Sequence, residues 1–114
     1  MVNSFRDLMV WQRSVEMTVV LNRLTWSFPQ EERLGLASHL RQASVFVTGN
    51  IAAGWRHQSD GASKDFLRRA SGSILEVQNQ LKLATELGLG DNAIRHHAED
   101  LSREVGNMLV SLMN

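Results

Sequence analysis

The sequence predicts an all-α protein that folds as an antiparallel, up-down-up-down four-helix bundle. Apolar residues recur every three or four positions along four segments, at about residues 7–28, 31–55, 62–87 and 92–113. These segments have similar lengths and short connections, as expected for antiparallel neighbours in a bundle. The chain has 114 residues, 43% of them hydrophobic, and a single proline. That length is sufficient for one domain with one hydrophobic core.

The first predicted helix, residues 7–28, carries two apolar stripes on opposite sides. At about 100° per residue, one stripe contains Val10, Met17, Leu21, Leu24 and Phe28, and the other contains Leu8, Trp11, Val15, Val19 and Trp26. A helix on the surface of a small monomer needs only one such stripe, because its opposite face meets water. We therefore expect one of the two stripes to be covered by another copy of the chain.

The second predicted helix, residues 31–55, follows a clear boundary. We expect Ser4 or Asp7 to cap the first helix and Pro29 to end it. The run Pro29–Glu32 then opens the second helix, with acidic residues near its positive N-terminal end. Its expected inner stripe contains Leu36, Leu40, Ala43, Val47, Ile51 and Gly54.

The third and fourth helices are separated by a glycine-rich break. The polar, turn-prone run Arg56–Gly61 is the expected connection into the third helix, near Ala62 or Ser63. The inner stripe of the third helix contains Phe66, Ala70, Ser73, Val77, Leu81 and Ala84. Gly88 and Gly90 interrupt the pattern, and Asp91 or Asn92 is expected to cap the fourth helix. The last inner stripe contains Ile94, Ala98, Leu101, Val105, Met108 and Leu112.

Composition limits the classes of function. The 12 basic and 12 acidic residues give zero formal net charge, which argues against a protein that wraps nucleic acid by charge alone. Cysteine is absent, so thiolate metal sites and disulfides are excluded and a reducing compartment is expected. The first ten residues do not form a signal peptide, and no apolar run is long enough to span a membrane. We therefore expect a cytoplasmic protein.

Two runs in the second helix, Leu36–Ala43 and Asn50–Gly54, carry a resemblance to a known family. They resemble the signature of the four-helix-bundle proteins encoded in 23S rRNA intervening sequences. Supporting matches are Phe5–Leu8, Val10–Gln12, Ser27–Pro29 and Gly72–Glu76. The resemblance implies a ring-like homopentamer. A related branch is the accessory variability determinant of diversity-generating retroelements, a basic pentamer that works with a reverse transcriptase and nucleic acid.

The resemblance also assigns the two stripes of the first helix. In the family pattern the positions of Val10, Met17, Leu21, Leu24 and Phe28 are the apolar ones, which implies that they face the bundle core. Val15, Val19 and Trp26, with Trp11 at the border, are then left for a neighbouring copy. We expect Trp55, Leu67 and Ile74 to face outward and extend this interface. Two distinct patches suit the heterologous contact that closes a ring.

A basic set is expected at the junction of the second and third helices: Arg41, Arg56, His57, Lys64, Arg68 and Arg69. One interpretation is a phosphate-contacting patch, repeated around a ring so that weak contacts add. The other is a solvated helix end whose charges pair with Asp60 and Asp65. The sequence leaves both interpretations open.

No constellation of residues indicates catalysis, a metal or a cofactor. His96 and His97 are adjacent and point about 100° apart on a helix, and His39 and His57 lack a carboxylate at ligand spacing. Glu76 is expected near the inner face, where Arg41 is a candidate partner, and no nucleophile, base and orienting group come together. Asn50 is expected on the inner face of its helix, where it would fix the alignment of the bundle.

Two functions remain. The first is a non-enzymatic, self-associating scaffold or interaction module. The alternative is a nucleic-acid-binding accessory protein that uses the modest basic patch and contacts RNA or DNA.

Overall fold

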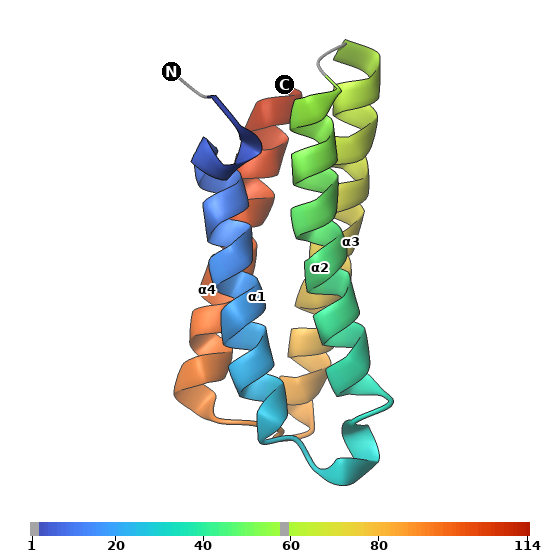
Figure 1. Ribbon diagram of the computed structural model, residues 1–114. Coiled ribbons are helices and arrows are strands. Elements are labelled where there is room, and N and C mark those ends of the chain that lie inside the picture. The colour runs from blue at the N-terminus through green and yellow to red at the C-terminus, as the bar shows by residue number, and fades with distance from the viewer. Residues whose placement is uncertain (1–2, 58–59) are drawn as a thin grey trace.

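The computed structural model describes residues 3–57 and 60–114, and it confirms the predicted all-α, up-down bundle (Figure 1). The four long helices are α1 (Met9–Trp26), α2 (Leu36–Arg56), α3 (Asp60–Glu86) and α4 (Asn92–Met113). Each helix packs against its neighbour in the chain, and α4 packs back against α1. The start of α1 and the end of α4 lie at the same end of the bundle as the end of α2 and the start of α3 (Figure 1). Among the described residues, no helix combines the length and hydrophobicity that crossing a lipid bilayer requires.

The two residues predicted to cap the first long helix cap a short helix that precedes it. A 3-10 helix, η1 (Phe5–Asp7), precedes α1, and Ser4 and Asp7 cap it reciprocally. The side chain of Ser4 accepts from the backbone N–H of Arg6 at 3.1 Å, and Asp7 Oδ2 accepts from the N–H of Ser4 at 3.3 Å. The extended residue Leu8 then separates η1 from α1, so neither predicted residue caps the long helix.

The second helix also begins later than predicted. Gln30–Glu32 form a separate 3-10 helix, η2, and α2 begins at Leu36. Gly35 explains the gap, because its backbone angles (φ −101°, ψ −110°) lie outside the helical region. The resulting connection leaves the Leu34 side chain 93% exposed.

Helices α2 and α3 approach each other closely. The Gly54 backbone is buried, and a Cβ on it would lie 3.4 Å from both Phe66 Cβ and the Ser63 carbonyl oxygen. Helix α3 begins at Asp60, so Asp60 and Gly61 belong to the helix and not to the predicted connection. Residues 58 and 59 of that connection lie outside the described residues.

The turn between α3 and α4 follows the prediction. Gly88 and Gly90 have positive φ values of 67° and 77°, which favour glycine. Position 90 also has no room for a larger residue, because a Cβ there would collide with the side chain of Leu24. Asp91 caps α4 as predicted, since its Oδ2 accepts from the backbone N–H of Ile94 at 2.9 Å.

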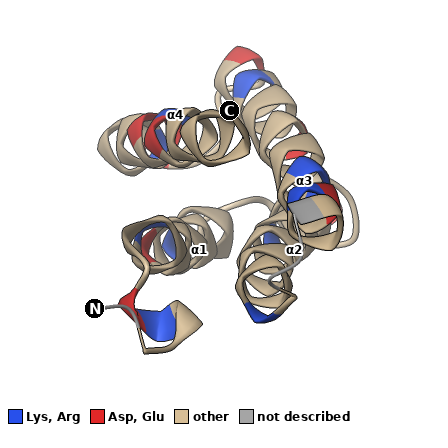
Figure 2. Cartoon of the chain, turned by 90° about the horizontal axis from the view of Figure 1, so that it is seen from above, with Lys and Arg blue, Asp and Glu red and all other residues tan. Residues whose placement is uncertain are grey.

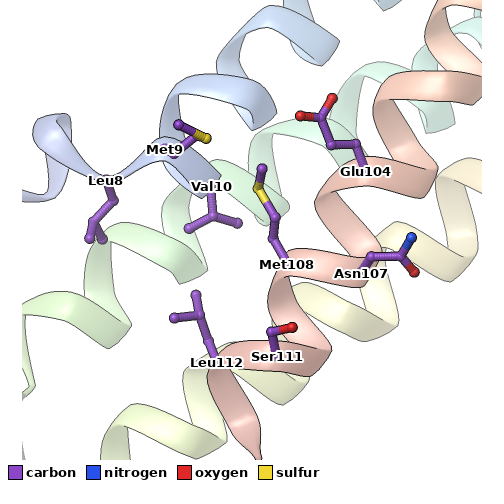
Figure 3. Close-up of a pocket in the computed structure, with 8 residues that line it drawn as sticks. All are labelled: Leu8, Met9, Val10, Glu104, Asn107, Met108, Ser111 and Leu112. Atoms are coloured by element: carbon purple, nitrogen blue, oxygen red, sulfur yellow. The ribbon is translucent and has the colours of Figure 1, made fainter.

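The core confirms the predicted inner stripe of α1 and corrects that of α4. Val10, Met17, Leu21, Leu24 and Phe28 are all buried. In α4, Leu109 is 0% exposed, whereas the predicted core residue Leu112 is 50% exposed. Leu112 lies in the last turn of α4, beside an open hollow of about 500 Å³ that Leu8 and Val10 line from the α1 side (Figure 3). The buried core of α4 therefore ends at Leu109, and the last turn of α4 borders the open hollow.

We expect Leu109→Ala to lower the free energy of unfolding by about 2–5 kcal/mol, because the change leaves a cavity among buried side chains. Leu112→Ala removes the same atoms from a half-exposed position and is the matched control, with an expected loss below about 1 kcal/mol. Urea denaturation followed by circular dichroism measures both. Equal losses for the two variants would contradict the core described here.

Candidate functional site

The predicted association surface of α1 faces away from the core. It consists of Trp11, Val15, Val19 and Trp26, which we call the α1 outer stripe. Val19 is 47% exposed and Trp26 is 76% exposed, whereas Val15 and Trp11 are half-buried. The outward orientation that the sequence predicted is therefore present. No partner chain is part of the structure, so the assignment of this stripe to an interface stays a prediction.

Trp11 lies at the border of the stripe because another part of the same chain covers it. The Phe5 ring of η1 meets the Trp11 ring edge to face, with centroids 5.2 Å apart and an interplanar angle of 71°. The short helix η1 also packs against α2. This contact leaves Val15, Val19 and Trp26 as the accessible part of the stripe.

Two of the predicted interface residues face the core instead. Leu67 is 8% exposed and Ile74 is 2% exposed, so the prediction that they face outward is wrong. Both lie where a glycine leaves room on the neighbouring helix. A Cβ on Gly54 of α2 would lie 3.6 Å from Leu67, and a Cβ on Gly106 of α4 would lie 3.4 Å from Ile74. The third additional residue, Trp55, is half-buried.

Other apolar side chains are exposed that the sequence interpretation did not use. On α2, Val45 is 57% and Phe46 is 58% exposed, and on α3, Leu75 is 66% and Leu83 is 46% exposed. Helical periodicity could have found Val45 and Leu75, because each lies on the side of its helix opposite the inner stripe. Phe46 and Leu83 lie on the flanks of their helices, roughly 100–120° from the inner stripe at 100° per residue. All four replace Leu67 and Ile74 as candidates for contact with another molecule.

Charge is unevenly distributed around the bundle (Figure 2). Helix α2 contains no carboxylate, and its two cationic residues other than histidine are Arg41 and Arg56. On α1, by contrast, Arg13 pairs with Glu16 of the same helix at 2.9 Å and with Glu104 of α4 at 3.1 Å. The hydrogen bond to Glu16, followed by the attraction of Glu104, raises the pKa of Arg13. Arg13 thus joins α1 to α4 through Glu104, whereas α2 has no carboxylate for such a pair.

The predicted basic set does not form one cluster. Arg41 lies 15 positions before Arg56 in the same helix, which is about 22 Å at 1.5 Å per residue. Arg41 therefore does not belong to the α2–α3 junction, and its Nε donates instead to Thr25 Oγ1 of α1 at 2.9 Å. The expectation that all six residues gather at the junction is wrong for this residue.

The remaining basic side chains at the junction are partly paired. Arg68 Nη1 lies 2.6 Å from Asp65 Oδ1, as the solvated-helix interpretation expects. The His57 ring stacks on the Phe66 ring with centroids 5.1 Å apart, and the Arg69 guanidinium lies 5.0 Å from the same ring. Arg56 is exposed, and Lys64 is half-buried. The charge available to phosphates at this end is smaller than the sequence count implies.

Two polar residues occupy positions other than those predicted. Glu76 is exposed and accepts a hydrogen bond from Gln80 Nε2 at 3.2 Å, so it is not the partner of Arg41. Asn50 is partly exposed, and its Nδ2 donates to the Phe46 carbonyl oxygen one turn earlier at 2.8 Å, so it does not align the core. In the part of the chain that the structure describes, no three His, Asp or Glu side chains gather as metal ligands would.

Comparison with known proteins agrees with the geometry. The family model described as "23S rRNA-intervening sequence protein" matches residues 6–111. A solved structure of a protein of unknown function from the S23 ribosomal protein family of Bacteroides thetaiotaomicron superposes with a TM-score of 0.82. Its sequence is 18% identical, and the match covers 91% of this chain and 94% of that one, which shows a shared fold. A search of curated proteins found no significant match.

We expect Arg41→Met to lower the free energy of unfolding by about 1–3 kcal/mol, because it removes a charged hydrogen bond that joins α1 to α2. Arg33→Met is the control, since Arg33 is exposed and the expected change is within about 0.5 kcal/mol. Urea denaturation measures both variants. An unchanged stability for Arg41→Met would show that its contact with Thr25 contributes nothing.

Proposed function

Because the chain belongs to the 23S rRNA-intervening sequence protein family, we propose that it is a non-enzymatic, cytoplasmic protein that assembles with copies of itself into a scaffold or interaction module. The observation that carries this proposal is the α1 outer stripe. Val19 and Trp26 are exposed on a helix whose opposite face is already fully committed to the core. Large apolar side chains in such a row favour contact with another protein surface.

The energetics require more than this stripe. Full burial of four exposed apolar side chains would contribute about 6–12 kcal/mol at roughly 1.5–3 kcal/mol each. The α1 outer stripe contributes less than this, because Trp11 and Val15 are already half-buried. Association itself costs about 4–15 kcal/mol in lost freedom of motion. A stable contact therefore needs additional surface, and the exposed Val45 and Phe46 on the adjacent helix α2 are suitable.

A ring is the assembly that the distribution of apolar surface favours. The α1 outer stripe and the Leu75–Leu83 side of α3 are different faces of the bundle. Contact between unlike faces is heterologous and closes into a ring when the rotation between copies divides a full turn. The number five, which would make a homopentamer, rests on the family resemblance. We propose no enzymatic role, since no described side chains form a nucleophile with a base and an orienting group.

We expect the double variant Val15→Glu and Val19→Glu to dissociate the assembly, because the new carboxylates would be buried without partners in the contact. Helicity should stay unchanged, since neither side chain is in the core. Size-exclusion chromatography with light scattering gives the mass, and circular dichroism gives the helicity.

Val110→Glu is the control, because Val110 is 53% exposed on α4 and lies outside the proposed contact. This variant should keep the mass of the unmodified protein. A monomeric mass for the unmodified protein at about 10 μM would mean that the dissociation constant of the contact lies above that concentration. That result would overturn the proposal.

A further inference from the structure

The open hollow of about 500 Å³ lies between the start of α1 and the second half of α4 (Figure 3). Its apolar lining comes from both sides: Leu8, Met9, Val10, Met108 and Leu112. Met9 is 60% and Leu112 is 50% exposed, so both side chains are accessible to a ligand. Pockets for small molecules have volumes of about 300–1,000 Å³, are mostly apolar and often lie between the helices of bundles. The hollow therefore has the size and the lining of a small-molecule site.

The path of the backbone forms this hollow. Leu8 is extended, with φ −74° and ψ 126°, and it separates η1 from α1. Helix η1 packs against α1 and α2, and within the described residues it makes no packing contact with α4. The chain thus turns away from α4 at the level of its last turn, and the space beside Leu112 stays open. Because reciprocal capping by Ser4 and Asp7 fixes this path, the hollow is present before a ligand binds.

The charge at the hollow is negative. Among the described residues that line it, Glu104 is the charged one, and its Oε1 lies 3.1 Å from Arg13 Nε. The same guanidinium pairs with Glu16, whose other oxygen lies 3.8 Å from Nε2 of His97. With histidine neutral, one guanidinium faces two carboxylates, so this group of side chains has an excess of negative charge. The contact with Arg13 involves Oε1 of Glu104, which leaves Oε2 to accept a hydrogen bond from a ligand.

The carboxylate and the exposed leucine lie at opposite ends of the hollow (Figure 3). Glu104 and Leu112 are eight positions apart in α4, which is about 12 Å at 1.5 Å per residue. An extended ten-carbon chain has a similar length, because nine C–C bonds of about 1.5 Å span roughly 11 Å in zigzag. The flexible side chains of Met9 and Met108 line the space between and adapt to apolar groups of irregular shape. A ligand with an apolar body and a positive head therefore fits in one orientation.

We propose that the hollow binds a hydrophobic amine, which is a molecule with an aliphatic or aromatic body and a protonated primary amino group. The ammonium group donates to Glu104 Oε2 and compensates the excess negative charge. The apolar body lies between Met9 and Met108 and reaches Leu112, so these side chains are removed from water. An anionic amphiphile with the same chain is disfavoured, because its head would face the Glu104 carboxylate.

This site goes beyond the proposed self-association and does not depend on it. At 100° per residue, Met9 lies about 80° around α1 from Val19 and about 120° from Val15. The hollow is therefore on the α4 side of α1, and the α1 outer stripe is on another side. A ligand in the hollow and a neighbouring copy on the stripe occupy different surfaces.

The test is nuclear magnetic resonance of the methionine methyl groups during titration with decylammonium chloride, up to a concentration of about 1 mM. The signals of Met9 and Met108 should shift, because both side chains line the hollow. The signal of Met17, which is 0% exposed in the core, should stay in place and is the internal control. Decanoate has the same chain length and the opposite charge, and it should bind about tenfold more weakly.

The charged end of the site is tested by Glu104→Gln. This variant should bind decylammonium about fivefold more weakly and should lose the preference for it over decanoate, because the carboxylate is removed. Glu86→Gln is the matched control, since Glu86 is also paired with a cation, Lys82, and lies outside the hollow. Its affinity should change less than about twofold. Circular dichroism of both variants checks that the helices are retained.

The apolar end is tested by Leu112→Ala, which should weaken binding of decylammonium about threefold to fivefold through lost apolar contact. Val110→Ala is the matched control, because Val110 is 53% exposed on the same helix and does not line the hollow. It should change the affinity less than about twofold.

Three outcomes would overturn the proposal. They are unshifted Met9 and Met108 signals, equal affinity of the unmodified protein for decylammonium and decanoate, and equal weakening by Leu112→Ala and Val110→Ala. A preference for decylammonium that persists in Glu104→Gln would exclude Glu104 as the partner of the amine and overturn that part.

The alternative occupant of the hollow is a second copy of the chain. Binding of decylammonium to the Val15→Glu, Val19→Glu protein but not to the unmodified protein would show that a neighbouring copy covers the hollow, and it would overturn the proposal. Light scattering records the mass of each sample. A monomer that binds the amine would contradict self-association alone, and an assembly that does not bind it would contradict the amine site alone.

Discussion

The burial of one face of α1 in the core is the constraint on which the rest of the structure depends. Met17, Leu21 and Leu24 are 0% exposed, so the rotation of α1 about its own axis is fixed. At about 100° per residue, that rotation turns Val19 and Trp26 outward, and no change of rotamer can return them to the core. The exposed stripe is a geometric consequence of core burial, and another molecule or water must cover it.

Periodicity and turn chemistry were sufficient to predict the four helices and the Gly88–Asp91 turn, because each depends on neighbouring residues. Periodicity gave two stripes for α1, and the family resemblance was needed to choose the one that faces the core. Leu67 and Ile74 were misassigned for a different reason. Each fills space that a glycine leaves on another helix, Gly54 in α2 and Gly106 in α4. Which glycine faces which leucine or isoleucine depends on the register between helices, and periodicity within one helix does not contain that register.

The same limit applies to the candidate surfaces. Arg41 was grouped with the junction because it is basic and belongs to α2, yet its Nε bonds to Thr25 on α1. The exposure of Val45, by contrast, follows from its position opposite the inner stripe of α2 and was accessible from the sequence.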